Sequence, residues 1–344
     1  MKLQFGVFDP SGLVWKTLLV SGNIRLGRAT RVIESAHLLA TCFKAHLSIH
    51  PRAGPVPGPV PGPVPGPVPG PVQRGAANDM LENSKRWTET TVHVAGSDLR
   101  IIKGGTGRPL LVLHDELGHS GCLKWQAAIA RAHSMYIPIH PGFGSLPRVD
   151  WISNVRDLAS FYSRMLREMA LGPIDVIGIS LGGWIAAEMA ASCAHQFRRM
   201  ALVAPMGIRP AEGEIMDLFA VTGRAYLDAS VHDQENTPEF DNLYGGEATP
   251  QQYEAWEDAR AESSRLAWQP YMHNPSLGPL LEGVTGLPTL LLWGIEDKIV
   301  PLNSGHLYNR HITGSELVTF QACGHRPEIE KSNEFIDRVQ EFLG

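Results

Sequence analysis

The sequence predicts an α/β protein with a mostly parallel central sheet and helices on both faces. Short apolar runs alternate with longer amphipathic stretches from residue 86 to residue 344. The apolar runs are continuous rather than alternating with polar residues, which is typical of strands buried on both faces. Strands of this kind that are joined by helices form parallel sheets covered on two sides.

Composition and charge narrow the functional class. The 344 residues are 43% hydrophobic and 19% charged, as in an ordinary globular protein. The net charge of -5 gives no basic surplus, so we expect no nucleic-acid partner. No apolar run reaches the length of a membrane span, so we expect no membrane association. The four cysteines lack paired or metal-ligand spacing, which favours reduced thiols, a cytoplasmic protein and no metal. The oligomeric state stays open.

The first 85 residues differ from the rest of the chain. Residues 1–53 form an N-terminal extension of uncertain structure, in which 1–9 suits a strand and 23–50 suits a helix. Residues 54–85 carry a Pro/Gly/Val repeat with proline at every second position, which prevents helix and sheet formation. We expect a mostly disordered, extended linker there. A ligand for a proline-recognition domain is an alternative, but a tolerated repeat expansion is favoured.

The remaining residues, 86–344, are expected to form one α/β domain. Residues 89–95 and 99–103 flank a turn at Gly96 and Ser97, which predicts a hairpin. The later strands are short apolar runs, and the helices between them repeat apolar residues at helical spacing. The expected strands are 110–114, 135–140, 174–180, 200–204, 288–293 and 316–321. The expected helices are 122–133, 151–171, 183–195, 302–311 and 328–342.

The alternation breaks between about residues 206 and 275. Strong strand patterns are absent there and helical patterning is plausible, so we expect a helical cap inserted over the carboxyl edge of the sheet. Its many aromatic and methionine side chains are expected to form mainly the cap's own core, with a few facing the active site. They are Met206, Met216, Phe219, Tyr226, Phe240, Tyr244, Tyr253, Trp256, Trp268, Tyr271 and Met272.

A Gly-x-Ser-x-Gly motif centred on Ser180 is the strongest functional signal. It joins a buried strand to a helix, and glycines at 178 and 182 relieve crowding in a sharp turn. Such a turn exposes the hydroxyl beside the free N–H groups of a helix N-terminus, where a developing oxyanion is stabilised. Ser180 is therefore the predicted nucleophile.

A serine nucleophile needs a base and a carboxylate that orients the base. His325 follows the last expected strand, at the sheet edge where open α/β proteins place their catalytic groups. Asp297 lies in the loop after the strand at 288–293, and its neighbour Glu296 is expected to be a solvated surface charge. The order Ser180, Asp297, His325 matches the Ser…Asp…His order of one hydrolase architecture.

These motifs resemble those of the α/β-hydrolase family over about residues 86–344. The resemblance includes the elbow at Ser180, the segments around Asp297 and His325, and the His114 segment. It implies an oxyanion hole made by the backbone N–H groups of Leu181 and Glu116. Asp115 stands where the family usually has glycine. Either it shapes the turn, or the carboxylates of Asp115 and Glu116 narrow the site and repel anionic substrates.

The resemblance implies a serine hydrolase that cleaves a small carboxylic ester or lactone through an acyl-enzyme. No cofactor or metal is expected, and the partner is a small-molecule substrate. A carbon–carbon bond hydrolase acting on a diketone-type ring-cleavage product is the alternative, with which Gly182, Gly183 and Arg265 are compatible. A non-catalytic binding module is the third possibility, against which the presence of all three triad residues argues.

Overall fold

The computed structural model describes residues 4–7, 16–19, 87–244 and 247–344. The chain divides into two compact units, Met1–Gly70 and Pro71–Gly344. In the first unit, β1 (Gln4–Val7) pairs with β2 (Lys16–Leu19) in antiparallel orientation. The helix expected over 23–50 and the repeat over 54–85 lie outside the described residues.

The second unit contains an eight-stranded sheet in the order β10-β9-β8-β7-β5-β6-β4-β3. Strand β4 is antiparallel to β3 and β6, and every other neighbouring pair is parallel, which confirms the predicted mostly parallel sheet. The strands are β3 (Trp87–Val94), β4 (Ser97–Gly104), β5 (Arg108–Leu113), β6 (His133–Pro138), β7 (Ile174–Ile179), β8 (Phe197–Val203), β9 (Thr289–Gly294) and β10 (Glu316–Phe320).

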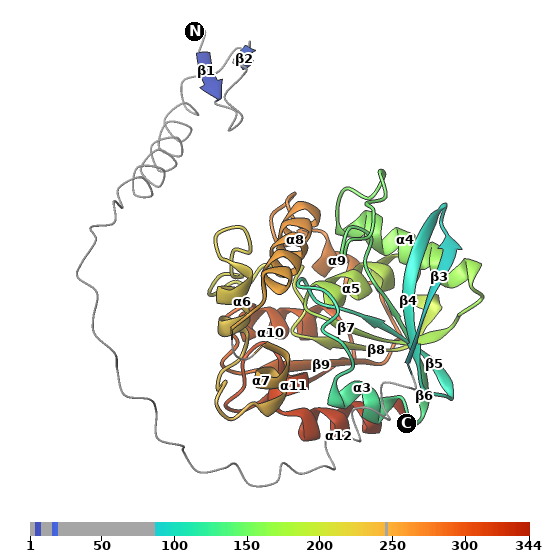
Figure 1. Cartoon of the computed structure of the whole chain (residues 1–344). Helices are drawn as coiled ribbons and strands as arrows, with labels where there is room; N and C mark the ends of the chain where they lie inside the picture. The colour runs from blue at the N-terminus through green and yellow to red at the C-terminus, as the bar shows by residue number, and fades with distance from the viewer. Residues whose placement is uncertain (1–3, 8–15, 20–86, 245–246) are drawn as a thin grey trace, which may run out of the picture. The chain divides into compact units, whose positions relative to one another are not determined.

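Helices cover both faces of this sheet, as the sequence predicts (Figure 1). One face carries α4 (Val155–Glu168), α5 (Leu181–Cys193), which runs on into a short 3₁₀ turn, α9 (Leu277–Leu281) and α10 (Leu302–His311). The opposite face carries α3 (Lys124–Ile129), α11 (Pro327–Glu330) and α12 (Ser332–Leu343). Two separate hydrophobic clusters fill the space between the helices and the sheet.

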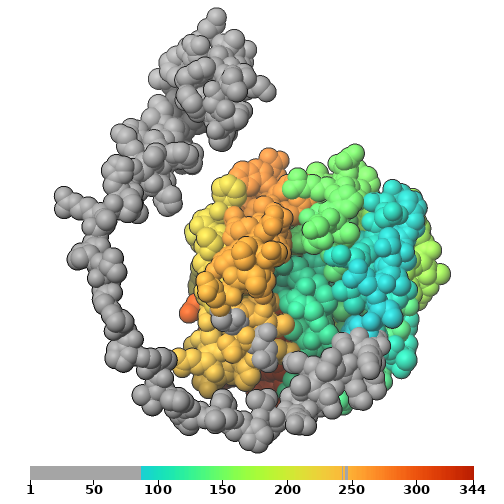
Figure 2. All heavy atoms as spheres, in the orientation of Figure 1, coloured from blue at the N-terminus to red at the C-terminus, as the bar shows by residue number. Residues whose placement is uncertain are grey.

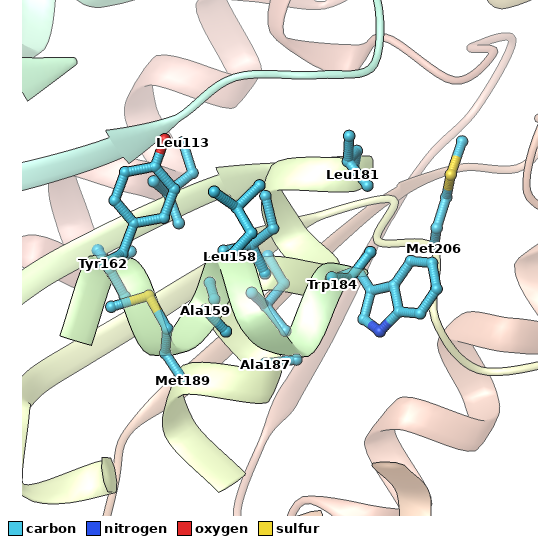
Figure 3. Close-up of a cluster of buried hydrophobic side chains, with 14 of the residues drawn as sticks. Leu113, Leu158, Ala159, Tyr162, Leu181, Trp184, Ala187, Met189 and Met206 are labelled. Atoms are coloured by element: carbon cyan, nitrogen blue, oxygen red, sulfur yellow. The ribbon is translucent and has the colours of Figure 1, made fainter. Parts of the chain in front are cut away.

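Helix α5 is apolar on nearly all sides because it lies between the sheet and α4. In Figure 3, Tyr162 and Leu158 of α4 lie beside α5, which carries Ala187 and Met189, and all four side chains are buried. Each large apolar side chain buried in this way contributes about 1.5–3 kcal/mol relative to an exposed one. The packing fixes the helix that begins directly after Ser180.

The segment between β8 and α9 forms the expected helical insertion. Its helices are α6 (Gly223–Ser230), α7 (Pro238–Tyr244) and α8 (Pro250–Leu266). The threonines at 222 and 249 cap α6 and α8 by accepting hydrogen bonds from backbone N–H groups. Figure 2 shows the yellow and orange atoms of this insertion closing against the green atoms of earlier segments of the domain. We call residues 206–275 the cap.

Four predicted helices have different bounds in the structure, and the helix expected over 183–195 spans Leu181–Cys193. Residues 122–133 are helical only over Lys124–Ile129, because β6 begins at His133 in register with β5. The helix expected from 151 begins at Val155, since the side chain of Asn154 accepts a hydrogen bond from the backbone of Asp157 and defines the N-cap. The helix expected over 328–342 is two helices, which meet at the non-helical backbone of Lys331.

Candidate active site

Ser180 occupies a strained turn between β7 and α5. Its backbone angles are φ 50° and ψ -108°, outside the regions that side-chain-bearing residues normally adopt. A Cβ at Gly178 would lie 2.5 Å from the carbonyl oxygen of Gly182, and one at Gly182 would collide with the carbonyl of Leu113. The N–H of Ser180 donates to the carbonyl of Val203 at 2.8 Å, which ties the turn to β8. The glycines of the motif are therefore required by close backbone approach.

The structure brings Ser180, His325 and Asp297 together in one hydrogen-bonded chain. The Nε2 atom of His325 lies 2.8 Å from the Ser180 hydroxyl oxygen, and its Nδ1 atom lies 2.8 Å from a carboxylate oxygen of Asp297. The other Asp297 oxygen accepts hydrogen bonds from the N–H groups of Ile299 and Val300, at 2.8 and 2.9 Å. This arrangement orients both the carboxylate and the imidazole, and it matches the geometry by which a histidine activates a serine.

The loop that carries His325 is held from three sides. The backbone N–H of His325 donates to the carbonyl of Ser230 in the cap at 2.8 Å. The carboxylate of Glu330 accepts the peptide N–H just before His325 at 2.6 Å. The carboxylate of Glu296, which was expected to be a solvated charge, accepts the N–H of Cys323 at 2.9 Å. The residue beside Asp297 therefore fixes the histidine loop.

Burial would lower the pKa of His325, but the attraction of Asp297 and the hydrogen bond to it outweigh this effect, with Glu116 and Glu328 adding to them. The pKa of His325 is therefore raised above its ordinary value. A histidine that accepts the serine proton must be neutral, so the base form of this site is favoured on the alkaline side of that raised pKa.

Asp115 joins the turn after β5 to the histidine loop. One carboxylate oxygen accepts the N–H of Leu117 at 2.9 Å, and the other pairs with Arg326 at 3.0 Å. Arg326 also pairs with Glu328 at 2.8 Å and donates to the hydroxyl of Tyr244. Asp115 therefore shapes its own turn, which was one of the two interpretations of the sequence. It also neutralises the buried guanidinium of Arg326. Sequence reasoning did not foresee this pair, because no local pattern marks it.

Replacing Arg326 by methionine should destabilise the fold by about 3–5 kcal/mol at pH 7, because the carboxylates of Asp115 and Glu328 would stay buried without their cation. Burial already raises the pKa of Glu328. A carboxyl whose pKa is raised in the folded state lowers the free energy of unfolding only at pH values at which it is ionised in the unfolded state. The destabilisation caused by Arg326→Met should therefore shrink as pH falls. Urea unfolding at two pH values measures this change in the free energy of unfolding. Arg338→Met, which breaks the exposed pair with Glu341, is the control, and an equal loss in both variants would contradict the prediction.

The Glu116 side chain lies at the position where the oxyanion hole was expected, which the backbone N–H groups of Leu181 and Glu116 were to form. One of its carboxyl oxygens is 3.4 Å from the N–H nitrogen of Leu181, and the other accepts the hydroxyl of Tyr226 from α6. Within the described residues, the Glu116 N–H has no hydrogen-bond acceptor. Burial, with repulsion from Asp115, raises the pKa of the carboxyl. Tyr226 is a contact that sequence reasoning missed, since nothing distinguishes it from the other cap aromatics.

The triad is closed to solvent. Ser180 is 0% exposed, and His325 and Glu116 are each 2% exposed. A cavity of about 220 Å³ lies elsewhere, beside α5, and its lining includes Trp184, Glu188 and Asn274 but no triad residue. Glu188 in that cavity is hydrogen-bonded to both Trp184 and Asn274.

Across residues 4–7, 16–19 and 87–344 apart from 245–246, no three His, Cys, Asp or Glu side chains are grouped so that they would hold a metal ion. In the same part of the chain, no helix is both long enough and apolar enough to cross a membrane.

A serine, histidine and aspartate at the carboxyl ends of strands of a mostly parallel sheet, beneath a helical insertion, define a capped α/β enzyme class. The chain belongs to the alpha/beta hydrolase family, whose family model matches residues 110–338. It is accordingly a hydrolase, which implies a small-molecule substrate.

Two relatives and two solved structures illustrate the similarity. The 2-hydroxy-6-oxo-2,4-heptadienoate hydrolase of Pseudomonas putida is 24% identical over 277 residues, covering 73% of this chain and 95% of the relative. The 2-hydroxymuconate semialdehyde hydrolase of a Pseudomonas species is 26% identical over 260 residues, covering 72% and 91%. A thermophilic esterase from Thermogutta terrifontis has a TM-score of 0.60 at 18% identity, covering 74% of this chain and 98% of the esterase.

A solved meta-cleavage product hydrolase from Pseudomonas fluorescens has a TM-score of 0.62 at 20% identity, covering 74% of this chain and 97% of that one. Likeness at this level of identity extends to the fold and is shared by esterases and carbon–carbon bond hydrolases alike. The choice between these activities therefore depends on the chemistry around Ser180.

Proposed function

We propose that this protein is a serine hydrolase that cleaves an uncharged carboxylic ester or lactone through an acyl-enzyme. The observation that carries the proposal is the buried hydrogen-bonded chain Ser180–His325–Asp297. His325 takes the Ser180 proton as the hydroxyl attacks the substrate carbonyl, and Asp297 stabilises the resulting imidazolium. His325 then protonates the leaving oxygen, and a water molecule hydrolyses the acyl-enzyme by the same route.

The groups around Ser180 favour an uncharged substrate. The carboxyl of Glu116 lies beside the nucleophile, and Asp115 follows the same strand. The positive charge of Arg326 is already shared by two carboxylates, those of Asp115 and Glu328. A substrate carboxylate placed here would be desolvated beside further carboxyl groups without a free cation to compensate it.

Arg265 was the cap residue considered compatible with a carbon–carbon bond hydrolase. In the structure its guanidinium pairs with Glu262 at 2.6 Å and donates to the carbonyl of Ile152 at 3.0 Å. An arginine with these two partners is not free to bind a substrate carboxylate. This arrangement supports ester or lactone cleavage over cleavage of an anionic dienoate.

Carbon–carbon bond hydrolysis remains the second candidate because of the relatives. Their names describe hydrolases of 2-hydroxy-6-oxo-2,4-heptadienoate and of 2-hydroxymuconate semialdehyde. The same triad geometry can serve either reaction, since both begin with a carbonyl compound in a closed, largely dry site.

A matched pair of esters separates the two candidates. We expect p-nitrophenyl butyrate to be hydrolysed with a kcat/KM at least about tenfold above that of mono-p-nitrophenyl succinate, because their acyl chains are alike in length and differ in charge. 2-Hydroxy-6-oxo-2,4-heptadienoate is the third substrate, and Ser180→Ala supplies the blank rate for each. A kcat/KM for the dienoate above that for the esters would instead assign the protein to carbon–carbon bond hydrolysis.

A further inference from the structure

The side chain of Glu116 approaches the Leu181 N–H, the backbone donor that is expected to bind the acyl oxygen of a substrate. We propose that the protonated carboxyl of Glu116 is a catalytic hydrogen-bond donor to the acyl oxygen of the substrate, acting with the Leu181 N–H, and that Tyr226 positions it. The inference rests on the proposed ester hydrolysis and identifies a further group of the same site.

The position of the Glu116 side chain supports this role. A carboxyl oxygen of Glu116 lies 3.4 Å from the Leu181 nitrogen, longer than the usual 2.9–3.0 Å for such a bond. The second carboxyl oxygen accepts the Tyr226 hydroxyl. A substrate oxygen can take over the weak Leu181 bond while Tyr226 still holds the other end of the carboxyl. The carboxyl then lies beside the substrate oxygen rather than leaving the site.

A proton on the Glu116 carboxyl fits the hydrogen bonds of the resting site. The neutral His325 ring donates its Nδ1 proton to Asp297, so its Nε2 accepts the only proton of Ser180. The Glu116 carboxyl lies 3.4 Å from the N–H nitrogen of Leu181 and accepts the Tyr226 hydroxyl. An ionised Glu116 would be held by this long Leu181 contact and the Tyr226 hydroxyl, and burying a carboxylate with so few donors is costly.

The surroundings of Glu116 agree with a proton on the carboxyl. Burial is the main cause that raises its pKa, and Asp115 on its own loop raises it further. Three groups on other elements oppose the rise, namely His325, the Ser180 hydroxyl and the Tyr226 hydroxyl. Ser263 of α8 faces the backbone carbonyl of Glu116 and does not titrate. A carboxylic acid kept neutral in an apolar site and donating to an oxyanion is an established catalytic device in another enzyme.

The proposed step conserves atoms and charge. The Ser180 oxygen bonds to the acyl carbon, the carbonyl π bond opens, and the Ser180 proton moves to His325. The negative charge gathers on the former carbonyl oxygen, which accepts hydrogen bonds from the Leu181 N–H and the Glu116 O–H. The proton of Glu116 stays on its carboxyl throughout, so no oxidant or co-reactant is needed. When the tetrahedral species collapses, the leaving oxygen takes the proton from His325.

Two variants at Glu116 test the donor role with p-nitrophenyl butyrate as substrate. Glu116→Ala keeps the backbone N–H and removes the carboxyl, and we expect kcat to fall roughly 10²- to 10³-fold while KM changes little. Glu116→Gln retains a side-chain donor, and we expect its kcat to stay within about tenfold of the wild type. A Glu116→Ala variant as fast as the wild type or faster would overturn the inference, because the carboxyl would then be a plug that substrates must displace.

The pH profile gives a second and independent readout. The donor form of Glu116 is the protonated one, so wild-type kcat should fall as pH rises through the raised pKa of Glu116. In Glu116→Gln this alkaline limb should vanish, because an amide does not ionise in this range. In Tyr226→Phe, which removes one bond to the carboxyl, kcat should fall and the alkaline limb should shift. Persistence of the same limb in Glu116→Gln would assign it to another group and overturn the inference.

A measurement without substrate keeps the inference separate from the proposed function. Difference infrared spectra of wild type minus Glu116→Gln at neutral pH should contain the C=O band of a protonated carboxyl, and a carboxylate band alone would overturn the inference. If the wild type has no Ser180-dependent ester hydrolysis, the proposed function fails even where this band is present. If hydrolysis depends on Ser180 but not on Glu116, only the present inference fails.

Discussion

Ser180→Ala should reduce kcat for ester hydrolysis by roughly 10⁴- to 10⁶-fold and leave the protein folded. The Ser180 hydroxyl is positioned for activation by His325, at 2.8 Å from Nε2. The strained backbone of the elbow is held by the close approach of Gly178 and Gly182 and not by the serine side chain, so alanine keeps the same turn. The melting temperature should therefore change by no more than a few degrees.

The control for this variant is Ser160→Ala, at an exposed position on α4. Its kcat should equal that of the wild type. Labelling with a fluorophosphonate probe adds a readout that needs no substrate, because an activated serine reacts and an unactivated one does not. A wild-type protein that is folded, unlabelled and inactive would favour a binding module, and full activity in Ser180→Ala would show that Ser180 is not the nucleophile.

Asp297→Asn should reduce kcat roughly 10⁴-fold with little change in fold. The Asp297 oxygen that accepts the N–H groups of Ile299 and Val300 must remain an oxygen, so the amide nitrogen of asparagine takes the position facing His325. That nitrogen donates to Nδ1 and forces the proton of the ring onto Nε2. A ring protonated at Nε2 cannot accept the proton of Ser180.

The pH profile distinguishes this effect from a general loss of structure. The attraction and hydrogen bond of Asp297 are the main causes that raise the pKa of His325 against its burial. Without the charge, the pKa of His325 falls, and the residual activity should persist to lower pH than in the wild type. Rates measured between about pH 5 and pH 9 record the shift. Asp241→Asn, at an exposed position, is the control, and a loss below about tenfold in Asp297→Asn would remove Asp297 from the triad.

The fold was predictable because each buried strand has its own continuous apolar run. Leu290, Leu291 and Leu292 of β9 are all buried, and such a run predicts a strand without knowledge of its neighbours. Element ends were less predictable, because they depend on register and capping. The start of β6 at His133, for example, is set by pairing with Arg108 of β5, which no local pattern reveals.

The same reasoning explains which site residues could be found from sequence. Asp297 and His325 each follow a strand, and parallel strands deliver their carboxyl ends to one edge of the sheet. Glu116 was expected to act mainly through its backbone N–H group, because a sequence does not reveal where a flexible side chain points. The partner of that carboxyl, Tyr226, comes from the cap, where helices carry many equivalent aromatic residues.

The helical cap also supplies hydrogen bonds to the reacting groups. Tyr226 holds the Glu116 carboxyl, Ser263 donates to the Glu116 carbonyl at 2.7 Å, and the carbonyl of Ser230 accepts the N–H of His325 at 2.8 Å. Because Ser180 is completely buried, we expect a substrate to reach it only when the cap moves, and such a movement would break some of these bonds. Under the proposed acyl-enzyme mechanism, we expect an open molecule to be unable to react until it recloses, so that solvent is shut out before the chemistry starts.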